Sequence, residues 1–197
     1  MSDAISAGLA DPVHDAQAAF RLALEAMARP GRIQTLAAAG ADWPLRPALA
    51  QLLLALTDEE TSVWWQEDSG ALRQWLRFHT GARSVDAPGD AAFAVATRPA
   101  DLPELRRFRN GSATAPEQSC TLLVEVPSLQ HGPRMDAFGP GIPGQVALAV
   151  AGLPEGFWAE WQESHAAFPQ GVDIFFTCGR SLLGLPRTTR IGRLQEV

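Results

Sequence analysis

Arginine and two threonines close the most apolar part of the sequence, at Arg187, Thr188 and Thr189. A guanidinium offers a bidentate fork to a phosphate or phosphonate, and threonine hydroxyls add further hydrogen bonds. The three residues follow an apolar run that ends at Pro186, and strand ends in α/β sheets are common ligand sites. A second interpretation stays open, in which Arg187 pairs at a subunit contact and the threonines complete the edge of the sheet.

Arg187 should have an anionic partner, because burying an unpaired guanidinium costs several kcal/mol. That partner would be a ligand or a carboxylate on another surface. Replacing Arg187 by alanine should then leave thermal unfolding nearly unchanged while binding fails. Removing the buried side chain of Ile174 should instead destabilise the domain by about 2–5 kcal/mol.

Two other segments are candidate anion sites. Arg77 and His79 end a predicted helix, where a cation interacts favourably with the helix dipole even without a function. Gly139 and Gly141 lie in a Gly/Pro segment whose N–H groups could converge on an anion, although a plain tight turn has the same composition. Both segments are therefore predicted as anion-binding or partner-docking sites, beside the structural interpretations that stay open.

Catalytic and metal-binding patterns are not specified by the sequence. The chain has no lysine, which rules out a lysine Schiff base, a lysine general base and a P-loop lysine. The four histidines and two cysteines show no ligand spacing, so we predict no metal and no cofactor. Cys120 begins an apolar strand and should be buried, and Cys178 is expected to be structural.

Bulk composition indicates a soluble globular protein of 197 residues with a formal net charge of −6. This charge makes nucleic acid and anionic membranes poor partners. Two thiols do not form a disulfide framework, the first residues do not resemble a secretory signal, and no apolar run could span a membrane. We expect a cytoplasmic location.

A β-hairpin should position Arg187. Residues 172–177 are β-branched and aromatic, a Gly-containing turn follows at 178–180, and residues 181–185 return as a second apolar run. The first run is apolar on both faces, so helices should lie above and below the sheet.

Helical and strand patterns alternate along the rest of the chain, which predicts a single-domain α/β fold: a helix–sheet–helix sandwich with a mixed sheet. Residues 1–10 should be a flexible tail and residues 11–197 one domain. The segments expected to be helical are 11–27, 47–57, 72–78 and 154–167, and those expected to be strands before the hairpin are 32–36, 62–66, 91–96, 120–126 and 145–150.

Apolar spacing in the first helix predicts that Phe20, Ala23, Leu24 and Met27 lie on its buried face, together with Ala16. The six tryptophans are costly to leave in water, so we expect them in the core or at an interface.

Several segments together resemble the PhnH family, whose members are small subunits of the bacterial carbon–phosphorus lyase complex. The most specific is the closing stretch, with Phe-Pro-Gln-Gly-Val-Asp-Ile at 168–174, Thr-Cys-Gly at 177–179 and Leu-Pro-Arg-Thr-Thr at 185–189. The earlier segments follow in the family's order: 15–17, 20–21, 27–31, 56–58 with Thr61, 76–80, 115–117, 122–124 and 139–142. The chain departs from the family pattern at 99–110 and 149–163.

The resemblance implies a role in phosphonate catabolism. Members work with PhnG, PhnI and PhnJ and, with PhnL, replace the adenine of ATP by a phosphonate to give ribose 1-phosphonate 5-triphosphate. PhnJ later breaks the carbon–phosphorus bond by radical chemistry that requires a cysteine cluster, which this chain lacks. The family fold resembles that of pyridoxal-phosphate transferases, isolated members are homodimers, and no catalytic residue is established for them, so none can be transferred.

Two functions stay open. The chain is either an assembly subunit that docks PhnJ or a second copy of itself, or a subunit that binds the phosphonate or ATP through its arginines. The missing lysine and the missing nucleophile–base pair favour the first.

Overall fold

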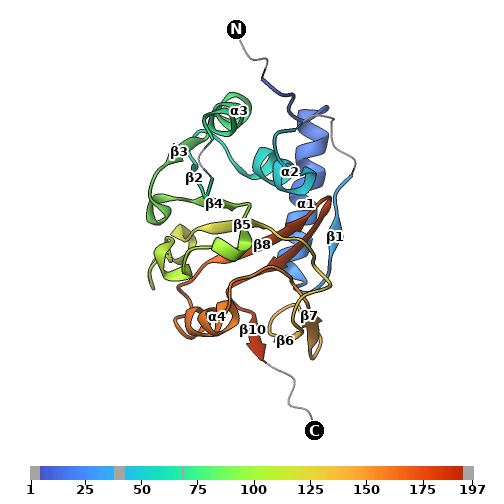
Figure 1. Cartoon of the computed structure of the whole chain (residues 1–197), viewed down its shortest axis with the longest axis vertical. Helices are drawn as coiled ribbons and strands as arrows, with labels where there is room; N and C mark the ends of the chain where they lie inside the picture. Colours follow the sequence, from blue (N-terminus) through green and yellow to red (C-terminus); the bar gives the residue numbers. More distant parts are fainter. Residues whose placement is uncertain (1–4, 38–42, 68, 193–197) are drawn as a thin grey trace.

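A mixed seven-stranded sheet runs through the computed structural model, which describes residues 5–37, 43–67 and 69–192 (Figure 1). Strands β3, β2, β4, β5 and β8 are parallel, and β9 runs antiparallel to both of its neighbours, β8 and β1. In spatial order the strands are β1 (Gln34–Thr35), β9 (Ser181–Leu185), β8 (Asp173–Cys178), β5 (Thr121–Glu125), β4 (Phe93–Ala96), β2 (Ser62–Trp65) and β3 (Arg83–Val85). The predicted α/β class and mixed sheet are thus confirmed. Residues 1–4 of the expected tail and 193–197 of the expected domain lie outside the described residues.

The predicted hairpin is confirmed as β8 and β9, in which Ile174 pairs with Leu185 and Cys178 with Ser181. Strand β8 is buried on both faces, because Ile174 and Phe176 belong to one apolar cluster and Phe175 belongs to the other. The hairpin lies inside the sheet, between β5 and β1.

Three helices cover one face of the sheet: α1 (Pro12–Ala28), α2 (Pro47–Leu56) and α3 (Gly70–Thr80) (Figure 1). Helix α1 begins at Asp11, whose carboxylate accepts the backbone N–H groups of Val13 and His14. Helix α3 begins at Ser69 and ends at Gly81, which has left-handed backbone angles.

The buried face of α1 agrees with the predicted one at Ala23 and Met27 and differs from it at Phe20 and Leu24. Its buried residues are Ala19, Ala23 and Ala26, whereas Phe20 and Leu24 are 46% and 54% exposed. The reason lies in β9, where a Cβ at Gly184 would approach the carbonyl oxygen of Ala26 to 2.5 Å. The helix therefore sits so close to the strand that small side chains fill the contact and large ones are excluded.

The other face is covered by one helix, α4 (Phe157–Ala166), and by a small antiparallel sheet, so the helical layer expected there is only partly present (Figure 1). The small sheet has the order β10-β6-β7, with bounds Arg190–Gly192, Met135–Phe138 and Val146–Leu148. Four short 3₁₀ helices complete the connections: η1 (Pro88–Asp90), η2 (Pro99–Asp101), η3 (Leu105–Arg107) and η4 (Pro116–Gln118). Likeness to the pyridoxal-phosphate transferase fold stays a prediction.

The tryptophans belong mainly to the interior. Trp65, Trp75 and Trp161 are at most 4% exposed, and the large exposed apolar residues among those described include no tryptophan. The expectation of a core location is confirmed for these three, and an interface rich in tryptophan is not presented by the described surface. Among the described residues, no helix combines the length and the apolar character that a membrane span requires.

Candidate functional site

Arg187 is held by acceptors of its own chain. Its Nε lies 3.2 Å from both carboxylate oxygens of Asp173, at the start of β8. Its Nη1 donates to the carbonyl oxygens of Pro116 and Pro169, at 2.9 and 3.4 Å, and its Nη2 donates to Ser119 Oγ. The side chains of Arg187 and Asp173 are 13% and 24% exposed, so this ion pair is largely removed from water.

The backbone after Arg187 is equally tied to the protein. The carbonyl oxygen of Arg187 accepts the Nδ1–H of His165, at 2.9 Å, and that of Thr189 accepts the indole N–H of Trp161, at 2.8 Å. Thr189 is fully buried, and its hydroxyl has no partner among the described residues. The loop between β9 and β10 is thus fixed by α4.

These contacts correct the expectation that the partner of Arg187 is a ligand or another surface: the partner is Asp173 of the same hairpin. The guanidinium lines a shallow depression of about 300 Å³ together with Thr188 and the exposed ring of Phe168, but its fork is occupied. The signal was readable in the sequence. A hairpin that pairs Ile174 with Leu185 places Asp173 opposite Pro186, next to Arg187 in the chain.

Gly139 and Gly141 lie where their backbone closely approaches the backbone of other segments. Both have positive φ, of 137° and 79°. A Cβ at Gly139 would lie 2.9 Å from the carbonyl oxygen of Thr188, and one at Gly141 would collide with that of Ala28. The structure therefore brings Gly139 beside the loop that carries Arg187, and it supports the turn interpretation of this segment.

Arg77 and His79 lie at the end of α3, apart from the hairpin loop. His79 Nε2 donates to the carbonyl oxygen of Ser6, at 2.9 Å. Two indole N–H groups bind the next carbonyls: Trp75 binds Ala7 at 3.3 Å, and Trp43 binds Gly8 at 3.2 Å. The segment expected to be a flexible tail thus includes residues 6–8, which two ring N–H groups of α3 and the indole N–H of Trp43 hold in place. We call residues 5–8 the N-terminal strap.

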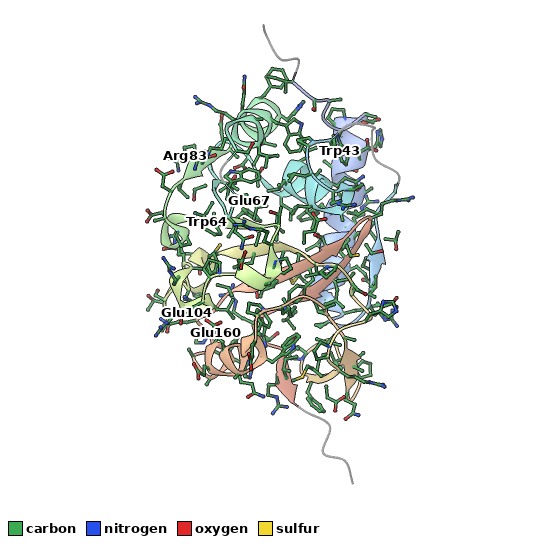
Figure 2. All side chains as sticks on the ribbon, viewed as in Figure 1. Trp43, Trp64, Glu67, Arg83, Glu104 and Glu160 are labelled. Carbon is green, nitrogen blue, oxygen red and sulfur yellow. The ribbon has the colours of Figure 1, made fainter. Side chains whose placement is uncertain are left out.

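A depression of about 960 Å³ opens between the strap, α3 and β3. Arg77 lines it together with Arg73 and Arg83, and Figure 2 shows Arg83 at the edge of the molecule near α3. We call it the basic depression. One signal for it was visible in the sequence, since Arg73 and Arg77 are four residues apart and share a helix face, but Arg83 lies on a strand that was not predicted.

A depression of opposite charge, of about 660 Å³, lies between η3 and α4 and is lined by Glu104, Glu155, Glu160 and Glu163 (Figure 2 labels Glu104 and Glu160). Burial raises the pKa of Glu160, and the backbone N–H of Leu105, which donates to its carboxylate, opposes the rise. Glu160 thereby joins α4 to η3. The three-residue spacing of Glu160 and Glu163 on α4 was readable in the sequence, but their proximity to Glu104 depends on the fold.

The chain passes from β2 to β3 on one side and from β4 to β5 on the other, so the carboxyl ends of β2 and β4 flank a switch point, a frequent ligand position in α/β sheets. Here the edge is closed by the protein itself. The amide of Gln66 binds both the N–H and the carbonyl oxygen of Arg98, at 2.8 and 2.9 Å. Glu67 accepts the hydroxyl of Thr97 and pairs with Arg98.

The histidines have separate partners: Asp11 for His14, Ser6 for His79, Ser128 for His131 and Arg187 for His165. In the described ranges, no three His, Cys, Asp or Glu side chains gather as metal ligands would, and the absence of a metal stays a prediction. Burial raises the pKa of the Cys120 thiol to about 12, which agrees with its predicted buried position and keeps it protonated at neutral pH.

The fold and these sites define a mixed α/β protein with two charged depressions. Its other conspicuous polar feature is Arg187 with the acceptors that surround it, which we call the arginine clamp. The family described as bacterial phosphonate metabolism protein (PhnH) matches residues 7–192. The chain therefore belongs to the PhnH family.

Two curated relatives are similar over most of their length. The subunit PhnH of alpha-D-ribose 1-methylphosphonate 5-triphosphate synthase of Rhizobium meliloti (strain 1021) is 37% identical over 195 residues, covering 98% of each chain. The putative C-P lyase subunit protein HtxG of Stutzerimonas stutzeri is 33% identical over 175 residues, covering 89% of this chain and 85% of the relative.

Proposed function

We propose that this chain is the PhnH subunit of a cytoplasmic carbon–phosphorus lyase complex and acts there in assembly. It would support the step in which methylphosphonate replaces the adenine of ATP, giving ribose 1-methylphosphonate 5-triphosphate and free adenine. The observation that carries the proposal is the 37% identity, end to end, with a subunit of the synthase named for that product. The proposed partners are PhnG, PhnI and PhnJ.

The arginine clamp supports an assembly role over direct chemistry at the hairpin. The fork of Arg187, which was the best sequence candidate for gripping a phosphonate, is taken up by Asp173 and by backbone carbonyls. The surface also presents an apolar stripe on α1. Val13, Phe20 and Leu24 are 62%, 46% and 54% exposed and lie along one side of α1, seven and four residues apart.

A reconstitution experiment tests the proposal. The synthase should be assembled from its subunits with and without this chain, and release of adenine from ATP should be followed in the presence of methylphosphonate. We expect loss of product without the chain and recovery on its addition, together with its co-purification with PhnG, PhnI and PhnJ. Product formed at an undiminished rate without the chain would reject the proposed function.

We further propose that a second copy of the chain covers the apolar stripe of α1 in the isolated protein. Replacing Phe20 and Leu24 by aspartate would place charges in that contact, where they lack partners. We therefore expect the isolated chain to sediment as a dimer at micromolar concentration and the double variant to sediment as a monomer.

Phe168→Asp is the control for this test, because Phe168 is also about half exposed, at 55%, and lies beside Pro116 and Arg187 instead of on α1. It should leave the dimer intact. If the α1 variant stays dimeric, or the control dissociates equally, the contact between copies lies elsewhere.

A further inference from the structure

The basic depression concentrates positive charge on an acidic protein. The chain carries a formal net charge of −6, yet three arginines line this one depression. Arg73 and Arg77 have like charges one helical turn apart, an arrangement that destabilises an isolated helix. Asp86 pairs with Arg73 and offsets part of this repulsion, and a bound anion would offset the rest.

The three arginines differ in what they already hold. Arg73 binds Asp86 through both terminal nitrogens, at 3.3 and 3.2 Å. Arg77 and Arg83 are exposed, and among the described residues no carboxylate lies within ion-pair distance of either guanidinium. Their forks can therefore bind an incoming anion without first breaking an ion pair.

The walls of the depression are held in place before any ligand arrives. The strap contributes Ile5 and is fixed by the ring N–H groups of Trp43, Trp75 and His79. The turn from α3 to β3 begins at Gly81, which has a φ of 80° and packs closely against Glu59. A site whose walls are already ordered loses little entropy on binding.

Phe78 adds an apolar surface to the same depression. Its side chain is 67% exposed, the largest exposure among the large apolar residues described, and its ring packs edge-on against His79. An exposed aromatic face beside arginines suits a ligand that joins a flat ring to a chain of phosphates. The volume of about 960 Å³ accommodates a ligand of that size.

We propose that the basic depression binds a triphosphate chain, with Arg77 and Arg83 as its main contacts. Arg73, which Asp86 holds in place, adds a third positive charge. Two molecules of the proposed function carry this group, ATP and the ribose 5-triphosphate product. The choice between these two sources rests on the proposed function, whereas binding of the triphosphate group does not. Phe78 would discriminate them, because only ATP offers a base to its ring.

Titration calorimetry of the isolated chain tests this, with inorganic tripolyphosphate and with ATP as probes. Each exposed arginine supplies charge-assisted hydrogen bonds, so Arg77→Ala and Arg83→Ala should each weaken tripolyphosphate binding about tenfold. The double variant should abolish detectable binding. Phe78→Ala should weaken binding of ATP while leaving that of tripolyphosphate unchanged if the base is bound as well.

Arg21→Ala with Arg134→Ala is the matched control, since both arginines are exposed and removing them changes the net charge equally. The control should bind tripolyphosphate like the natural chain, and all variants should melt like it. Equal weakening in the control, or no binding by the natural chain, would overturn the site. A third outcome is also possible: the natural chain binds no tripolyphosphate, and the Arg77/Arg83 variant fails to assemble with the partner subunits. This outcome would overturn the site in favour of an acidic protein partner. Because binding is measured without the complex, this result is independent of the adenine-release assay.

Discussion

Replacing Arg187 by alanine is expected to lower the free energy of unfolding by about 2–4 kcal/mol, close to the loss expected for Ile174→Ala. The substitution leaves the carboxylate of Asp173, which is only 24% exposed, without its cation. It also removes the donors to the carbonyl oxygens of Pro116 and Pro169. Urea unfolding followed by tryptophan fluorescence measures the change.

Arg190→Ala is a suitable control, because Arg190 is exposed on β10 and makes no ion pair within the described residues. It should change stability by less than about 0.5 kcal/mol. A double-mutant cycle with Asp173→Ala should show a loss well below the sum of the two single losses, as for any coupled pair. If Arg187→Ala instead unfolds like the natural chain while complex assembly fails, the interpretation of Arg187 as a docking or anion-binding residue regains its support.

The second large effect is expected at Gly184, where Gly184→Val should destabilise the protein by about 3 kcal/mol or more. A Cβ there would lie 2.5 Å from the carbonyl oxygen of Ala26 and 2.8 Å from the backbone nitrogen of Met27. These are backbone atoms of α1, which cannot turn aside as a side chain could, so the whole helix must move away from the sheet.

Gly192→Ala gives the comparison, because a Cβ at that strand position meets Phe138 only at an ordinary 3.5 Å. It should be nearly neutral in the same unfolding measurement. Gly184→Ala should fall between the two, at about 1–3 kcal/mol. Equal stabilities for Gly184→Val and the control would show that α1 does not depend on this close approach.

Gly184 also explains why the sequence predicted the existence of α1 well and its orientation poorly. The cap at Asp11 and the helical periodicity are local and therefore readable. Which stripe faces the sheet is decided by a glycine far along the chain, and that glycine favours Ala19, Ala23 and Ala26 over Phe20 and Leu24. Hydrophobicity alone ranks those residues in the opposite order.

The hairpin was predicted correctly because two long apolar runs surround a short turn. Strands β3, β6 and β10 were missed because they are only three or four residues long and carry charged or small residues such as Arg83, Asp136 and Gly192. Of the candidate site residues, Arg77 lines the basic depression, while Arg187 and the glycines are engaged in internal contacts. Whether a polar side chain faces solvent or its own chain is a tertiary property, which a local motif does not contain.

The place of the hairpin in the sheet has a consequence for synthesis on the ribosome. Among the described residues, strand β1 pairs only with β9, and the contact surface of α1 includes Gly184 of that strand. Helix α1 and strand β1 therefore emerge long before β9, and although α1 can pack against α2 early, the surface that both present to β9 stays uncovered until that strand has been made. Such long-range pairing slows folding and leaves aggregation-prone apolar surface exposed until the pairing has formed. We therefore expect ribosome-bound chains that stop short of β8 to bind chaperones, because the sheet closes only after β8 and β9 have been made.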